Sequence, residues 1–262
     1  MPPETILTAT GICHSFGGLM ALEDVDFQIK RKEIVSLIGP NGAGKTTLFN
    51  LFTGHYNPTR GEIYFNNRKI NGLKPYQVTP IGIARTFQNI RLFGQMSVLE
   101  NVLVGQHCRT RSGLFDAILR TRGFRQEEAR ARKVALEMLA FVRLEEKKDE
   151  KACNLSYGEQ RRLEMARALA TNPSLLLLDE PLSSLDRGLR EELSAELGRV
   201  LRAAGTTALY VTHDHDEAFT VADRVGVMIA GSLVRLATPG ELWNEPGSAE
   251  VARFLGFQVL PD

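Results

Sequence analysis

The residues that most directly suggest chemistry form a glycine-rich run at positions 39–47. The run reads G-P-N-G-A-G-K-T-T and matches the phosphate-loop pattern G-x-x-x-x-G-K-[ST]. Glycines let the backbone turn so that several N–H groups point at phosphate oxygens, and a helix that follows such a loop favours an anion at its N-terminus. The lysine would neutralise phosphate charge, and the hydroxyl after it can ligate Mg²⁺. The residues predicted to bind a nucleotide phosphate are Gly39, Pro40, Asn41, Gly42, Ala43, Gly44, Lys45, Thr46 and Thr47, with Thr46 as the Mg²⁺ ligand.

Two carboxylates, Asp179 and Glu180, follow four consecutive leucines at residues 175–178. The leucines predict a strand buried on both faces, and unpaired charges at its end would be costly unless a cation and a water meet them. Asp179 is suited to holding Mg²⁺, directly or through water, and Glu180 to polarising an attacking water. A strand that simply emerges into solvent is the alternative interpretation.

A third motif, at residues 154–160, has two interpretations. From the residues alone, Ser156 and Glu159 form a capping box, and Gly158 opens a helix whose N-terminus offers a second anion-binding surface. A plain helix cap without a ligand fits the same residues. The run N-L-S-Y-G-E-Q also resembles the signature motif of ABC-type ATPases, usually Leu-Ser-Gly-Gly-Gln, from which Tyr157 and Glu159 depart.

Further motifs of that family occur in the expected order, and the resemblance covers about residues 7–256. Phe16 resembles the aromatic residue that stacks on adenine, and Gln88 resembles the Q-loop glutamine that senses magnesium and water. His213 resembles the switch histidine, and residues 183–186 resemble the D-loop. Simpler interpretations exist: a core aromatic for Phe16, a surface loop for Gln88, and a metal cluster for the His-Asp-His-Asp run at 213–216.

The resemblance implies which cofactors the chain binds and which role each of these residues has. ATP and Mg²⁺ are the expected cofactors, with Glu180, His213 and Gln88 as catalytic residues and Thr46, Gln88 and Asp179 near the metal. Two cassettes of this family pair head to tail, and the signature motif of one covers the ATP on the other. Ser156 and Gly158 would therefore act on nucleotide across the interface, so a single chain would carry half of each site.

The segments that position these motifs alternate between strand and helix, which indicates an α/β fold with a mainly parallel core sheet. Val25, Phe27 and Ile29 alternate with polar residues, the pattern of a strand with one exposed face. Residues from about 98 to 170 have helical spacing. We expect a single ABC ATPase domain over residues 1–262, with an N-terminal antiparallel β part and a helical subdomain at about 95–167. Buried strands are predicted at residues 34–38 and 175–178, and further strands at 207–211 and 225–229.

Composition narrows the function classes further. The chain has 262 residues, 43% of them hydrophobic, and a net charge of +1, so the charge balance gives no reason to expect a nucleic acid partner. Cys13, Cys108 and Cys153 lie too far apart for a disulfide framework or a metal site and suit a reducing cytosol. The N-terminus lacks signal-peptide features, and there is no run of about 18 apolar residues. If the chain drives transport, another protein must supply the channel.

The resemblance to ABC-type ATPases, in a chain with one cassette and only a modest helical insert, implies the ATPase subunit of a bacterial membrane importer, peripheral on the cytoplasmic face of the inner membrane. The expected partners are a second ATPase subunit, identical or different, integral membrane permease subunits and, indirectly, a solute-binding protein. Candidate contacts with the permease are Phe87, Ile90, Arg91, Leu92 and Phe93. The alternatives are a non-transport cassette, such as a DNA-maintenance ATPase or a ribosome-associated factor, and an inactive regulatory cassette.

The sequence on the two sides of Pro181 resembles different importer groups. Up to Pro181 it resembles branched-chain amino-acid importer cassettes, through residues 15–19, 85–93 and 154–164. Residues 182–186 and 211–214 resemble thiamine, iron or sugar importers instead. A recombined or engineered chain is one explanation, and an unusual natural branch is another. Because the predicted permease contacts precede Pro181, we expect the substrate to be a branched-chain or other hydrophobic amino acid.

Overall fold

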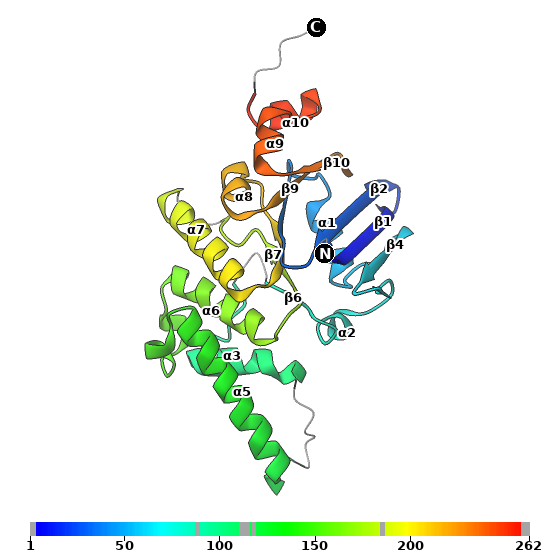
Figure 1. Cartoon of the computed structure of the whole chain (residues 1–262). Coiled ribbons are helices and arrows are strands. Elements are labelled where there is room, and N and C mark those ends of the chain that lie inside the picture. The colour runs from blue at the N-terminus through cyan, green and yellow to red at the C-terminus, as the bar shows by residue number, and fades with distance from the viewer. Residues whose placement is uncertain (1–3, 87–89, 110–115, 117–118, 184–186, 258–262) are drawn as a thin grey trace.

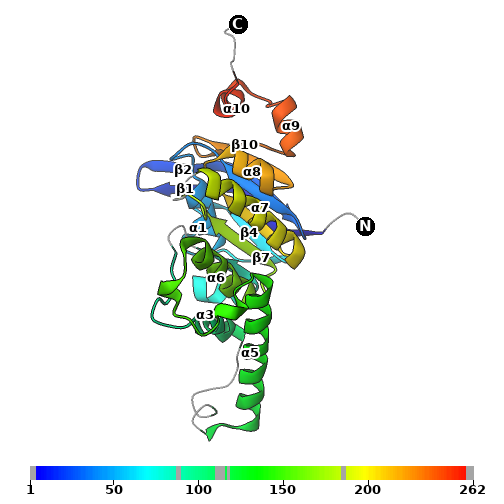
Figure 2. The same ribbon diagram turned by 90° about the vertical axis from the view of Figure 1, so that its left-hand side faces the viewer.

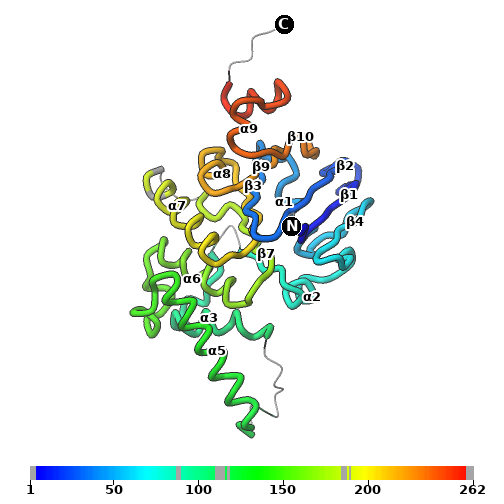
Figure 3. The backbone as a smooth tube through the Cα atoms, viewed as in Figure 1, coloured from blue at the N-terminus to red at the C-terminus, as the bar shows by residue number. Residues whose placement is uncertain are grey.

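A computed structural model describes residues 4–86, 90–109, 116, 119–183 and 187–257 of the chain. Figures 1 and 2 show two β-sheets with helices packed around them, and helix α5, which extends away from the body. In the backbone trace of Figure 3, the C-terminal helix α9 lies at the opposite end of the molecule from α5. Among the described residues, no helix combines the length and the apolar composition needed to cross a membrane.

The first sheet is antiparallel and carries the alternation seen in the sequence. Its strands lie in the order β2-β1-β4-β5. Val25, Phe27 and Ile29 are buried, as their spacing predicts. A tight turn joins β4 to β5, and both of its residues, Asn66 and Asn67, have positive φ, a conformation that asparagine tolerates. The strands are β1 (Thr5–Phe16), β2 (Leu19–Lys30), β4 (Arg60–Phe65) and β5 (Arg68–Lys69).

The second sheet brings the chemical motifs to one edge. Its order is β10-β9-β3-β8-β7-β6, and every neighbouring pair is parallel except β10 and β9. Every residue of β3, β7 and β8 is buried, which explains why their sequences are nearly all apolar. Because β8 pairs with both β3 and β7, the carboxyl ends of these three strands are adjacent. The strands are β3 (Ile34–Ile38), β6 (Ile83–Arg85), β7 (Leu175–Asp179), β8 (Thr207–Val211), β9 (Arg224–Ile229) and β10 (Ser232–Ala237).

Separate hydrophobic clusters hold the layers together. One lies between the antiparallel sheet, α1 and one side of the parallel sheet, and a second packs α7, α8 and the C-terminal helices on the other side. Gly205 follows α7 with a φ of 59°, the left-handed conformation in which a glycine commonly ends a helix. The helices outside the helical insert are α1 (Lys45–Phe52), α2 (Pro75–Val78), α7 (Arg187–Ala204), α8 (His215–Val221), α9 (Pro239–Asn244) and α10 (Ala249–Phe254).

A third cluster of buried residues lies in the helical insert and includes residues of α3, α5 and α6. The prediction that residues from about 98 to 170 are helical is right for these segments and wrong between α5 and α6. There the chain leaves α5 through Arg143, whose φ is 58°, and makes two short 3₁₀ turns. The helices are α3 (Val98–Gln106), α5 (Arg122–Phe141) and α6 (Tyr157–Ala170).

Candidate nucleotide-binding and hydrolysis site

The glycine-rich loop connects the end of β3 to the start of α1, the strand–loop–helix context expected for phosphate binding. The backbone requires glycine at positions 39 and 44, because both residues have positive φ. A Cβ at Gly39 would lie 2.2 Å from the carbonyl oxygen of Met228, and a Cβ at Gly44 would lie 2.7 Å from that of Ala21. Helix α1 begins at Lys45, so its N-terminal N–H groups face the loop. The loop can therefore surround an anion with backbone donors.

Lys45 spans the loop. Its Nζ donates hydrogen bonds to the carbonyl oxygens of Gly39, at 2.7 Å, and Pro40, at 3.0 Å. The side chain is buried, and burial lowers the pKa of its ammonium, an effect that the carboxylates of Glu180 and Asp179 oppose. When phosphate binds, its charged oxygens would replace the two neutral carbonyl oxygens as acceptors for Lys45, because charged acceptors form stronger hydrogen bonds with an ammonium.

Asp179 is the last residue of β7 and is only 7% exposed. Burial raises the pKa of its carboxyl group; the nearby Arg85 opposes the shift, Glu180 adds to it, and Lys45 opposes it. The Arg85 guanidinium reaches the carboxylate, with 3.8 Å between Nη2 and Oδ2. In the sequence, Arg85 stands out only as part of the motif at residues 85–93. Its contact with Asp179 could not be predicted because it depends on the pairing of β6 with β7.

The residues present fit Mg²⁺ through their donor chemistry. Thr46 and Asp179 offer a hydroxyl and a carboxylate oxygen, the hard ligands that Mg²⁺ prefers. Within the described part of the chain, no three His, Cys, Asp or Glu side chains gather in a way that could hold a metal ion. Mg²⁺ usually takes several of its ligands from water and substrate phosphates, so one or two protein ligands are enough. Asp179 and Thr46 would hold it, and it would neutralise charge on the phosphates.

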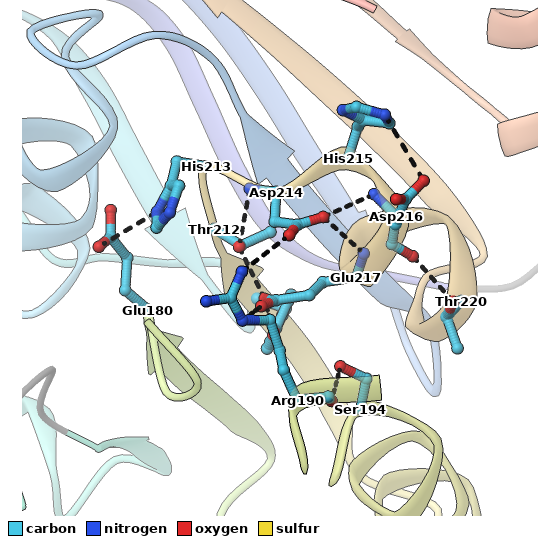
Figure 4. A network of polar contacts seen from close by, with 11 residues as sticks. Glu180, Arg190, Ser194, Thr212, His213, Asp214, His215, Asp216, Glu217 and Thr220 are labelled. Atoms are coloured by element: carbon cyan, nitrogen blue, oxygen red, sulfur yellow. Dashed lines mark hydrogen bonds and ion pairs between the residues drawn. The ribbon is translucent and has the colours of Figure 1, made fainter. Parts of the chain in front are cut away.

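Glu180 follows Asp179 in a left-handed backbone conformation, with a φ of 40°, a sparsely populated region for a residue with a side chain. Its N–H donates to the carbonyl oxygen of Val211 at the end of β8. Its carboxylate lies beside the His213 ring, with 3.5 Å between Oε2 and Nδ1 (Figure 4). The two predicted catalytic groups thus meet across the ends of β7 and β8.

The His-Asp-His-Asp run separates into different environments. Figure 4 shows His213 directed toward Glu180, whereas His215 lies on the other side of the turn beside Asp216. Asp214 is the N-cap of α8 and accepts hydrogen bonds from the N–H groups of Asp216 and Glu217. The run therefore forms a helix entry, and the structure gives no support to the metal-cluster interpretation.

Phe16 lies at the end of β1 and is 44% exposed, so it is not a core aromatic residue. Its ring meets the rings of His14 and Tyr56 edge to face, with centroids 4.7 and 5.2 Å away. Sequence analysis missed these two neighbours because their approach depends on the fold. The arrangement leaves an exposed aromatic surface that can take a flat heterocycle.

The signature segment forms the predicted capping box at the start of α6. The Ser156 hydroxyl accepts from the N–H of Glu159, and the Glu159 carboxylate accepts from the N–H of Ser156. Gly158 has no steric reason within the described chain to be glycine, since a Cβ would meet only Leu193 at 3.9 Å. A group that approaches from outside the chain would supply such a reason.

The capping box leads to a prediction about pH. The Lys147 ammonium, 2.8 Å from Glu159, and the N–H of Ser156 lower the pKa of the Glu159 carboxyl group from 4.5 to about 2. A lowered folded-state pKa stabilises the fold above the unfolded value, and this stability is lost as pH falls from about 4.5 through about 2. We expect the difference in unfolding free energy between wild type and Glu159→Gln to be constant above that window and to shrink within it, measured by urea unfolding. Lys147→Met should reduce the pH-dependent part, and a difference independent of pH would contradict the assignment.

Two predicted elements lie outside the described residues. Gln88, with Phe87 beside it, falls in the segment 87–89, and Ser184, Leu185 and Asp186 of the D-loop-like motif fall in 184–186. Their assignments stay predictions. Ser183, the first residue of that motif, is described, and its N–H donates to the carbonyl oxygen of Glu180.

Comparison with known sequences finds similarity to ATP-binding proteins of transport systems. The model of the ABC transporter family matches residues 22–183. The high-affinity branched-chain amino acid transport ATP-binding protein LivG of Salmonella typhimurium is 41% identical over 243 residues, covering 93% of this chain and 95% of LivG. BraF of Pseudomonas aeruginosa, with the same description, is 38% identical over 92% of this chain and 94% of its own. The spermidine/putrescine import ATP-binding protein PotA of Clostridium novyi is 36% identical over 99% of this chain and 70% of PotA.

Solved structures agree with the sequence relatives. MJ1267, an ATP-binding cassette of an ABC transporter in its ADP conformation, is 30% identical and superposes with a TM-score of 0.81 over 96% of this chain and 98% of its own. The ATP-binding cassette MJ0796, as a dimer in a post-hydrolysis state with ADP and Pi, is also 30% identical, with a TM-score of 0.71 over 89% of this chain and 99% of its own. The alignment with LivG spans more residues than precede Pro181, so the similarity continues beyond that point.

Proposed function

The chain belongs to the ABC transporter family as an ATP-binding cassette, and from this premise we propose that it hydrolyses MgATP to power a bacterial importer of branched-chain or other hydrophobic amino acids. The observation that carries the substrate class is the identity with LivG and BraF over more than nine-tenths of the chain. The substrate class rests on relatives because a cassette does not contact the transported solute. We propose one ABC ATPase domain whose helical subdomain covers about residues 95–167.

The site supports hydrolysis by water attack on the outer phosphate. The glycine-rich loop and Lys45 would hold the phosphates, and Thr46 and Asp179 would hold Mg²⁺, which would neutralise phosphate charge. Glu180 would then orient water, with His213 beside it. Phe16 would stack on adenine. Gln88 would complete the site as sensor of water and metal.

We propose that the active form is a head-to-tail pair in which Ser156 and Gly158 contact the partner's nucleotide. The dimer of the related cassette MJ0796 supports pairing of two such chains. A Cβ at Gly158 would meet only Leu193, at 3.9 Å, so the described chain gives no steric reason for glycine there, which supports contact from outside the chain.

A groove between the sheet and the helical insert suits a permease helix. A cavity of about 530 Å³ lies between α2 and β6 on one side and α3 and α6 on the other, and Arg85 and Arg91 contribute to its lining. Tyr76 is 75% exposed and Phe93 is 50% exposed at this groove. Exposed aromatic rings beside arginines are typical of protein interfaces. Docking there would place the chain on the cytoplasmic face of the membrane, with a solute-binding protein acting indirectly through the permease.

A second substrate class has its own support. The residues after Pro181 depart from the usual branched-chain pattern, and a PotA protein is 36% identical over nearly the whole chain. An importer of another small solute is therefore the competing function. The ATPase chemistry would be the same.

Reconstitution in liposomes tests the proposal. The purified chain should couple ATP hydrolysis to uptake of a branched-chain amino acid when combined with permease subunits of a LivG-type importer and its solute-binding protein. Polyamine-, thiamine- or iron-type permease subunits serve as controls. Coupling only to those controls would overturn the amino-acid assignment and leave the ATPase assignment intact.

A further inference from the structure

Arg190, in the first turn of α7, makes contacts that the hydrolysis chemistry does not itself require. Its Nη1 donates a hydrogen bond of 3.1 Å to Oδ2 of Asp214, and its Nε lies 3.6 Å from Oε1 of Glu217. Arg190 follows the segment that resembles the D-loop by only four residues. Asp214 directly follows the histidine that faces Glu180. The contacts therefore connect α7 to the loop that carries His213 (Figure 4).

Glu217 is a buried carboxylate held by several donors. It is 5% exposed and accepts hydrogen bonds from the hydroxyl groups of Tyr210 and Thr212. Burial raises the pKa of its carboxyl group, and both the hydroxyl donors and Arg190 act against the rise. A buried carboxylate that keeps its charge without a nearby cation has a large desolvation cost, and the positive charge of Arg190 offsets part of that cost for Glu217.

These contacts form a closed ring around the backbone of His213. Arg190 holds Asp214, the Asp214 N–H donates to the Thr212 hydroxyl, and that hydroxyl donates to Glu217, which faces Arg190 again. Thr212 and Asp214 are the two chain neighbours of His213. The histidine itself is 44% exposed in its side chain, so its position depends on its backbone and on Glu180.

We propose that Arg190 is a positioning residue for ATP hydrolysis, which acts by fixing the His213 backbone so that the ring stays beside Glu180. The proposal rests on the proposed ATPase function. Through Arg190, any displacement of α7 is passed to His213. Because α7 begins directly after the D-loop-like segment, the ring gives the cassette a physical path from that segment to the hydrolysis site.

The neighbourhood of the ring makes the test practical. A polar cavity of about 280 Å³ adjoins it between α7 and α8, so water can replace a shortened side chain. Arg202, near the other end of α7, provides a matched control. It lies 3.7 Å from Asp223 and donates to the Val221 carbonyl oxygen, so within the described part of the chain its ion pair and hydrogen bond lie outside residues 212–217.

Three variants separate positioning from stability. Arg190→Met should lower kcat by about 10- to 100-fold, the cost typical of a misplaced catalytic group, with the affinity for ATP changed less than about twofold. Arg190→Lys should recover part of kcat. Arg202→Met should keep kcat near that of wild type. Should Arg190→Met fail to fold, Asp214→Asn keeps a good N-cap and removes the charge that Arg190 meets, so it should lower kcat in the same direction.

A spectroscopic readout distinguishes positioning from general destabilisation. The chain has five histidines, so ring-labelled protein gives few resonances and His213→Ala assigns the one of interest. The His213 resonance should shift or broaden in Arg190→Met and stay unchanged in Arg202→Met. An unchanged kcat and His213 resonance in Arg190→Met would overturn the proposal, as would equal losses in both variants. A wild-type chain without ATPase activity would instead overturn the proposed function.

Discussion

Glu180→Gln should bind MgATP and hydrolyse it slower than wild type by about 10²–10⁴-fold, the usual contribution of a general base. Glutamine fills the same volume and keeps the backbone bond between the Glu180 N–H and Val211, so the fold should be retained. The carboxylate that faces His213 at 3.5 Å and would orient the water is lost. Single-turnover hydrolysis and nucleotide binding, measured on the same preparation, separate the two effects.

The expected physical state of this variant is an ATP-bound dimer, because hydrolysis would no longer release the paired cassettes. Size-exclusion chromatography with MgATP should show the dimer, and MgADP should not stabilise it. Lys45→Ala is the contrasting variant, since it removes the cation of the phosphate loop and should weaken binding itself. Turnover near the wild-type rate in Glu180→Gln would exclude Glu180 from this role.

Ser156→Arg should nearly abolish hydrolysis while the nucleotide affinity of the monomer stays close to wild type. Ser156 caps α6, and an arginine there would put a bulky side chain on the surface that we propose covers the partner's nucleotide. Loss of the cap costs about 1 kcal/mol of stability, which is too little to explain loss of activity in a folded chain. Titration with a fluorescent nucleotide at concentrations below dimerisation measures the first property, and steady-state ATPase activity measures the second.

Ser248→Arg is the matched control for this effect. Ser248 caps α10 in the same manner, with its hydroxyl accepting from the Val251 N–H, but α10 packs in the C-terminal part of the chain. It should lose a similar amount of stability and keep its ATPase activity. If both variants lost activity equally, cap loss rather than the shared site would explain the result.

Local sequence predicted most of the elements that carry the motifs. The apolar runs at 34–38, 175–178 and 207–211 are strands of the parallel sheet, because a strand covered on both faces needs no polar residues. Glycines of the phosphate loop were recognisable because their backbone conformations exclude side chains. The capping box at Ser156 was recognisable because its hydrogen bonds are local.

Contacts between segments that lie far apart in the chain could not be predicted from the sequence. The approach of Arg85 to Asp179 depends on strand pairing, and the ring through Arg190 and Glu217 depends on how α7 packs beside α8. No local sequence pattern predicts such contacts, because arginine and glutamate residues are usually exposed and their burial cannot be inferred from their neighbours in sequence. The break between α5 and α6 was missed although two local signals mark it: residues 145–151 are all charged, and the capping box at Ser156 begins a new helix.

The most direct test of the shared site is complementation between two inactive variants. Lys45→Ala disables the phosphate loop and Ser156→Arg disables the signature segment. In a head-to-tail pair of one of each, one composite site carries both defects and the other carries neither. Mixing equal amounts should therefore restore ATPase activity to about a quarter of wild type if subunits pair at random and sites act independently. A mixture that forms mixed dimers, verified with differently tagged chains, but stays at the sum of the two separate rates would contradict the account.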